Sequence, residues 1–212
     1  MKEQSLKQKT VGALLWNLLD RMGQQVLLFI VGIIVANILS VEDYALVGML
    51  AIFTAIANIV LDSGFSSALI RKQDATEEDY SSVFYFNLSI SVVLYAILFF
   101  AAPNIAQFYN QPLLTDLTRI IFLSLPFNSL SLIQNTLLNK KIEFKRLAKI
   151  NFISLLISGG CSLAMAYNGL GVWTLAWQPV ILSFSKSALL WMSNKWRPKL
   201  IFKLSNIQSL FG

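Results

Sequence analysis

The chain contains no histidine and only one cysteine, Cys161, among its 212 residues. These absences exclude an intrachain disulfide, a zinc site of cysteine and histidine, and a nucleophile activated by a neighbouring histidine. The sequence also has no phosphate-binding glycine loop and no cluster of metal ligands. We therefore predict no enzyme, no metal and no other cofactor. Because Cys161 lies in an apolar run, we expect a small buried packing residue rather than a reactive thiol.

Charge is scarce as well. Only 13% of the residues are charged, about half the ~25% that is typical of soluble domains. Hydrophobic residues make up 56% of the chain, and the mean hydropathy is +0.62. So little charge cannot cover so much apolar surface in water. The composition predicts a membrane protein, with the lipid bilayer as its main partner.

Apolar runs of about 18 to 25 residues are long enough to cross the hydrocarbon core of a bilayer as helices. The first run is too long for a signal peptide, and no small-residue cleavage site follows it. We therefore predict an all-α, polytopic membrane protein with about six transmembrane helices. They are expected at approximately 11–39, 44–62, 81–102, 118–138, 147–167 and 171–192.

Basic residues are distributed unevenly between the predicted connections. Of the 17 lysines and arginines, 14 fall before the first helix, between helices two and three, between four and five, or after the sixth. Lysine and arginine concentrate on the cytoplasmic side of membrane proteins, so this side is predicted to be cytoplasmic, with both chain ends on it. The net charge of +6 then reflects topology and anionic lipid, and we predict no nucleic-acid partner.

The first predicted helix begins with a row of polar residues. Asn17, Asp20, Arg21, Gln24 and Gln25 follow a spacing that places all five on one helix face. Ionisable groups within a membrane are costly against lipid and usually face a bundle interior or a water-filled cavity. Two interpretations remain open: a polar cavity open to the cytoplasm, or an amphipathic helix start at the membrane interface.

Milder polar groups recur in the later helices. Asn128 and Asn135 in the fourth helix are candidates for a cavity, whereas the serine rows of helices four and five more often mark helix-packing seams. Lys186 in the sixth helix has a functional interpretation, but it lies near enough to the basic end to extend toward the headgroups. Pro126 and Pro179 are each expected to interrupt a helix.

Three segments resemble the polysaccharide transporter family. Residues 39–49, LSVEDYALVGM, resemble the family's "LSPEDYGLVG" turn and second-helix start, with valine and alanine in place of its proline and glycine. Residues 62–71, DSGFSSALIR, look like the end of its second helix. Residues 171–178, GVWTLAWQ, are similar to its "GVWALVWQ" entry to helix six. Together they extend along the chain in the family's order.

This resemblance implies the O-antigen and exopolysaccharide flippase branch of the multidrug/oligosaccharidyl-lipid/polysaccharide exporter superfamily. Such proteins have two six-helix lobes around a central cavity and move undecaprenyl-diphosphate-linked oligosaccharides across the bacterial inner membrane. Residues 1–212 match the first lobe only, so we expect a chain truncated before a second lobe, or one that pairs with a second copy. Arg21 and Lys186 would then face the diphosphate or acidic sugars, and Asn128, Asn135 and Gln178 would bind sugar hydroxyls.

Other functions stay open at this point. A small-molecule or drug exporter of the same superfamily would have a less charged, more aromatic cavity. A membrane-embedded glycosyl- or acyltransferase would need acidic residues at a membrane face, for which Asp20 and Asp62 are the main candidates. An inactive fragment of a disrupted gene is the third alternative.

Overall fold

The computed structural model describes residues 6–61, 64–72 and 74–203, with side chains from Arg21 onward and that of Leu18. Regular structure in these ranges is entirely helical, which confirms the predicted all-α class. The helices are α1 (Leu6–Ile38), α2 (Val41–Met49), α3 (Ala51–Leu61), α4 (Phe65–Arg71), α5 (Glu77–Phe108), α6 (Leu114–Phe122), α7 (Ser124–Lys140), α8 (Phe144–Tyr167) and α9 (Val172–Ser193).

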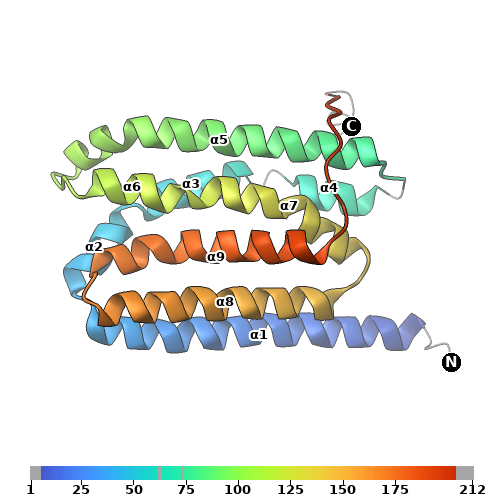
Figure 1. Cartoon of the computed structure of the whole chain (residues 1–212), viewed down its shortest axis with the longest axis horizontal. Coiled ribbons are helices and arrows are strands. Elements are labelled where there is room, and N and C mark those ends of the chain that lie inside the picture. The colour runs from blue at the N-terminus through green and yellow to red at the C-terminus, as the bar shows by residue number, and fades with distance from the viewer. Residues whose placement is uncertain (1–5, 62–63, 73, 204–212) are drawn as a thin grey trace.

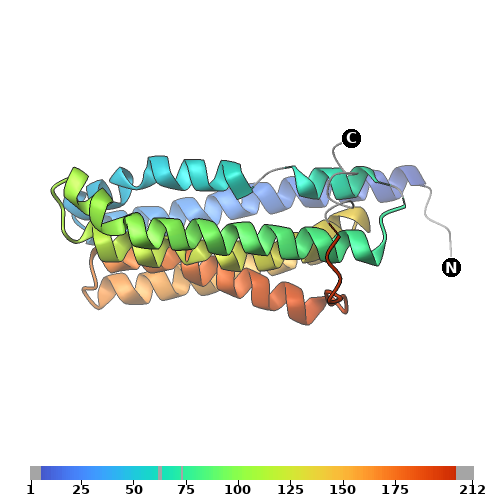
Figure 2. The ribbon, with the colours of Figure 1, turned by 90° about the horizontal axis from the view of Figure 1, so that it is seen from above.

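The helices form an elongated bundle whose members run along a common axis. Figure 1 shows α5, then α6 with α7, then α9, α8 and α1 stacked in a row. The segment α2–α4 lies behind this row and contacts α9, α5 and α7 in turn. Seen from above, α3 and α4 lie on the side of the bundle opposite to α8 and α9 (Figure 2). Six bundle segments therefore follow one another: α1, α2–α4, α5, α6–α7, α8 and α9.

The second segment differs from the single helix expected at 44–62. It consists of α2, α3 and α4 and extends to Arg71. Ser40 and Asp43 form a reciprocal capping box that fixes the start of α2. Gly64 precedes α4 with φ of 76°, a left-handed conformation that glycine adopts without strain. The apolar run therefore predicted a membrane crossing but could not show that its backbone is broken.

The fourth segment breaks where Pro126 requires it. Proline has no backbone N–H and its ring clashes with the carbonyl four residues earlier, which here belongs to Phe122. Helix α6 ends at Phe122, and α7 begins two residues further on, at Ser124. The predicted interruption is confirmed. The expectation for Pro179 is wrong, because it lies inside α9, which continues from Val172 to Ser193 as one helix.

The surface exposes many large apolar side chains, and the seams between the helices bury polar side chains, mostly serine and threonine, beside apolar ones. Exposed side chains include Phe29 on α1, Ile59 on α3 and Phe100 on α5. Within the described residues, five segments are long and apolar enough to cross a membrane. The sixth segment, α9, is not among them. It packs between α8 and α7 and holds Lys186 and several buried serines, so protein rather than lipid surrounds much of it.

Cys161 is exposed, so the expectation of a buried packing residue is wrong. Helix α8 presents its serines to α9 and Gly159 to α1. The remaining side of the helix, where Cys161 lies, faces outward.

One end of the bundle, which we call the basic end, gathers most of the described lysines and arginines. Here α1, α5 and α8 begin, and α4, α7 and α9 end (Figure 1). Buried Asp79, in the first turn of α5, accepts from Lys72 Nζ at 2.9 Å. Lys140 Nζ donates to the carbonyls of Leu69 and Lys72 at 3.2 and 2.6 Å. These bonds tie α4, α5 and α7 together at the basic end.

Residues 194–203 form a strap across the basic end. After α9 the chain extends over α7 and α5 instead of leaving the bundle (Figure 1). The backbone N–H groups of Lys199 and Lys203 donate to the hydroxyls of Ser81 and Ser82, at 3.0 and 3.1 Å. The strap thus fixes the end of α9 to the start of α5.

Replacement of Asp79 by asparagine should destabilise the folded chain by about 2 kcal/mol, because the ammonium of Lys72 loses a buried, charge-assisted partner. Thermal unfolding in detergent measures the effect. Glu78→Gln is the matched control: Glu78 also binds a lysine, Lys203, but its side chain is 41% exposed, so the loss should be small. Equal losses in the two variants would contradict a special role for the buried pair.

Candidate functional site

The seam between α1 and α8 contains a close helix approach. Gly159 on α8 faces Val31 on α1, and a Cβ atom at Gly159 would lie 3.0 Å from Val31 Cγ2. Small residues allow membrane helices to approach closely. The dispersion contacts that form then stabilise the helix pair, because the hydrophobic effect does not drive helices together within lipid. This contact sets the separation of α1 from α8.

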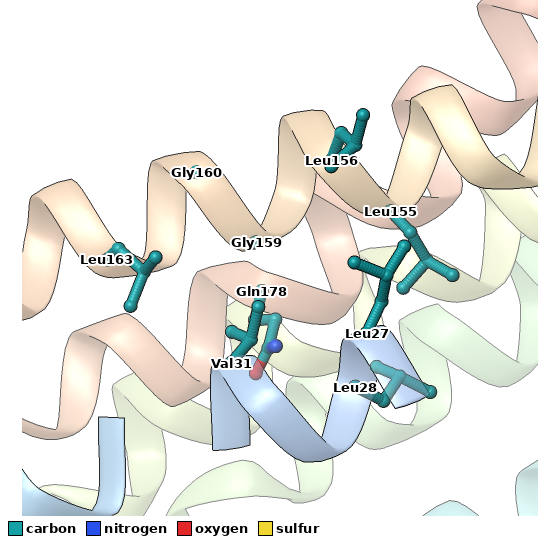
Figure 3. Close-up of a pocket in the computed structure, with 9 residues that line it drawn as sticks. All are labelled: Leu27, Leu28, Val31, Leu155, Leu156, Gly159, Gly160, Leu163 and Gln178. Carbon is teal, nitrogen blue, oxygen red and sulfur yellow. The ribbon is translucent and has the colours of Figure 1, made fainter. Parts of the chain in front are cut away.

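A groove of about 180 Å³ opens beside this contact. Figure 3 shows its lining from three helices, with aliphatic side chains around the two glycines of α8. Gln178, on α9, is the polar side chain among the lining residues and lies between α1 and α8. The lining residues are Leu27, Leu28, Val31, Leu155, Leu156, Gly159, Gly160, Leu163 and Gln178.

The floor of the groove is fixed by a hydrogen bond between α8 and α9. Ser158 Oγ donates to the backbone carbonyl of Gln178 at 2.9 Å. Ser154, Ser158 and Ser162 are all buried along this seam. The serine row of the fifth predicted helix therefore lies in a helix-packing seam, as the sequence analysis favoured.

The polar row of the first predicted helix divides between two environments. Arg21 and Gln25 are exposed, whereas Gln24 is half-buried. Gln24 and Arg21 precede Leu28, which lines the groove, by four and seven residues, so the three lie in one row along α1. Asn17 and Asp20 belong to α1, but their side chains lie outside the described residues.

The other candidate residues are spread over the bundle. Asn128 is exposed on α7, and Lys186 is half-buried on α9. Asn135, also on α7, is half-buried, and its Oδ1 atom has no hydrogen-bond partner among the described residues. None of these three lines the groove. Of the predicted site residues, the structure brings Gln178 to the groove and places Arg21 and Gln24 on the row that leads to it.

Sequence reasoning missed two structural residues. Gly159 sets the approach of α1, and its signal was the Gly159–Gly160 pair inside an apolar helix. Buried Asn87 on α5 donates through Nδ2 to the carbonyl of Leu61, the last residue of α3, at 3.3 Å. The sequence analysis did not single out Asn87, because the break after α3, which leaves the carbonyl of Leu61 available, was not predicted.

Long apolar helices, an apolar surface and polar seams define a multi-pass membrane protein of purely helical architecture within the described part. The chain belongs to the family described as "Polysaccharide biosynthesis protein", which matches residues 34–212. No solved structure matches it.

Several curated proteins are similar to the chain over nearly its whole length. The teichuronic acid biosynthesis protein TuaB of Bacillus subtilis is 28% identical over 210 residues, covering 98% of this chain and 44% of TuaB. The succinoglycan biosynthesis transport protein ExoT of Rhizobium meliloti is 26% identical, covering 92% and 40%. The lipopolysaccharide biosynthesis protein WzxC of Escherichia coli is 20% identical, covering 96% and 42%. The chain thus spans less than half the length of these relatives.

Gly159→Val should loosen the α1–α8 seam, because the added methyl groups would overlap Val31; overpacking of this kind destabilises by about 1–3 kcal/mol. The measurement is the midpoint of thermal unfolding. Gly160→Val is the control, since a Cβ at Gly160 meets nothing within 4 Å and helix propensity changes equally. A Gly160 variant that loses as much stability as the Gly159 variant would contradict the close-contact account.

Proposed function

We propose that this chain is one lobe of a transporter that moves a lipid-linked oligosaccharide, a precursor of polysaccharide or lipopolysaccharide, across the bacterial inner membrane. Family membership supports the link to polysaccharide biosynthesis, and similarity to ExoT, a succinoglycan biosynthesis transport protein, supports transport. The undecaprenyl diphosphate carrier is the substrate that the family resemblance suggests.

The observation that carries the proposal is the sparse packing of α1. Only 6% of residues 21–38 are buried inside the lobe, although this segment is apolar and belongs to the bundle. Its main contact is α8. A helix held along one side leaves its other sides for lipid or for a second protein body.

A second body would complete the transport path. Alternating access in secondary transporters comes from the rocking of two repeats or bundles around a site at their interface. This lobe supplies one such bundle. The second is either further protein, in keeping with the greater length of the relatives, or a second copy of this chain.

The proposed roles follow from position and chemistry. Arg21 would bind the diphosphate, because its planar guanidinium donates two parallel hydrogen bonds to an anion. Lys186 would supply a second positive charge. The remaining polar candidates would bind sugar hydroxyls or line the entrance: Asn17, Asp20, Gln24, Asn128, Asn135 and Gln178.

The basic end is proposed to face the cytoplasm, with both ends of the chain on that side. With Cys161 replaced by serine, single cysteines at Asn110 and Asn168, at the opposite end, should react with an impermeant thiol reagent in intact spheroplasts. Cysteines at Asp74 and Lys141 should react only after permeabilisation. All four positions are exposed, so burial does not confuse the result. Labelling of all four from one side would contradict the topology.

Arg21→Ala, made in the complete transporter, should abolish most polysaccharide export, and Arg21→Lys should retain part of it, because lysine keeps the charge but not the paired hydrogen bonds. The measurement is surface polysaccharide per unit of membrane-inserted protein, in a strain that lacks its own copy. Arg119→Ala is the control: Arg119 contacts Asp116 and the Phe99 ring at the opposite end. Normal export by Arg21→Ala would favour an interfacial helix start.

A further inference from the structure

We propose that the groove between α1 and α8 binds one acyl chain of an anionic phospholipid, whose headgroup lies against Lys145, Lys149 and Arg21. The proposal does not depend on transport. It rests on the shape of the groove, its opening toward the membrane, and the placement of positive charge along the same helix rows.

The groove suits a hydrocarbon chain. Eight of its nine lining residues are leucine, valine or glycine. Leu28 and Leu156, at its margins, are 41% and 50% exposed on the apolar surface, so the groove opens where lipid lies. Gly160 leaves space in the part of the groove that α8 lines, since a Cβ atom at this position would meet no atom within 4 Å. Its volume of about 180 Å³ accommodates part of one chain rather than a whole lipid.

The helix rows that line the groove continue to the basic end as basic residues. On α8, Lys149 and Lys145 precede Leu156 by seven and eleven residues, which places all three in one row. Seven residues correspond to about 10 Å of helix. Arg21 stands in the same relation to Leu28 on α1. Lys145, Lys149 and Arg21 are all exposed.

Helix direction strengthens this arrangement. Both α1 and α8 start at the basic end (Figure 1), so their side chains tilt toward that end. Helix α8 begins at Phe144, so the positive end of its dipole lies beside Lys145. The carboxylate of Glu143, before α8, is held by Arg146 at 3.0 Å. Basic pockets between membrane helices are typical sites for anionic headgroups. An anionic phospholipid therefore fits both ends of the site, whereas a zwitterionic lipid satisfies only the apolar part.

The test is native mass spectrometry of the chain, released from nanodiscs that contain equal amounts of phosphatidylglycerol and phosphatidylcholine. Wild type should retain mainly phosphatidylglycerol. The double variant Lys145→Gln, Lys149→Gln should lower that preference by about fivefold or more, because each lysine contributes attraction to an anionic headgroup. Gly160→Leu should fill the groove and reduce retention of both lipids.

Matched controls separate the site from general charge and helix effects. Lys195→Gln with Lys199→Gln removes two exposed lysines from the strap, and Gly48→Leu fills open space on α2; neither should change lipid retention. Photoactivatable phosphatidylglycerol, with the reactive group on its acyl chain, should crosslink wild type within 27–31 and 155–163. This measurement needs no folded variant.

Each of the following results would overturn the proposal: equal retention of the two lipids by wild type, unchanged retention in Gly160→Leu, or crosslinks spread evenly over the exposed faces of α3 and α5. Loss of preference in the strap control as large as in the α8 variant would likewise show general surface attraction rather than a site.

Discussion

The hydrogen bond from Ser158 to the carbonyl of Gln178 joins α8 to α9 at the centre of the bundle. Helices in a bilayer gain little from hiding apolar surface from one another, because lipid is as apolar as leucine. Close packing and hydrogen bonds across seams must hold them instead. Ser158, through its hydrogen bond, and the small residue Gly159, through close packing, meet this requirement on two sides of one helix. Helix α8 thereby positions both α9 and α1, and the groove exists because of that arrangement.

Different interactions hold the two sides of the lobe. At the basic end, the bonds of Lys72, Asp79 and Lys140 and the strap 194–203 fix α4, α5, α7 and α9 to one another. Helix α1 has α8 as its main neighbour. A set of helices tied together by hydrogen bonds, with one apolar helix that packs closely along one side only, is the arrangement expected of a body that meets a partner or lipid along α1.

The sequence predicted the helical membrane class because apolar runs of sufficient length have few other solutions in a bilayer. Pro126 also predicted the break between α6 and α7, since its effect is local. The break between α3 and α4 was not predicted, because Gly64 and the cap supplied by distant Asn87 acquire meaning only in three dimensions. The exposure of Cys161 depends on which side of α8 its neighbours occupy, which an even apolar pattern does not reveal.

The candidate site was predictable only in part. Spacing placed Arg21 and Gln24 on one helix row, but it could not show that α8 adds Lys145 and Lys149 beside a groove that Gln178 reaches from α9. The sequence also made Asn128 and Asn135 candidates for a cavity, yet they lie on α7 and do not line the groove. Residue type and period identify candidates, whereas helix packing decides which of them meet.

The central claim is that the chain takes part in translocation and leaves the chemistry of its substrate unchanged. The most direct measurement is the structure and leaflet of the lipid-linked oligosaccharide in cells from which the gene has been deleted, read by mass spectrometry and by accessibility to a glycan-modifying enzyme added to spheroplasts. The account predicts a chemically complete oligosaccharide that accumulates out of reach on the cytoplasmic leaflet. An incomplete or altered oligosaccharide, or a complete one still accessible from outside, would contradict it.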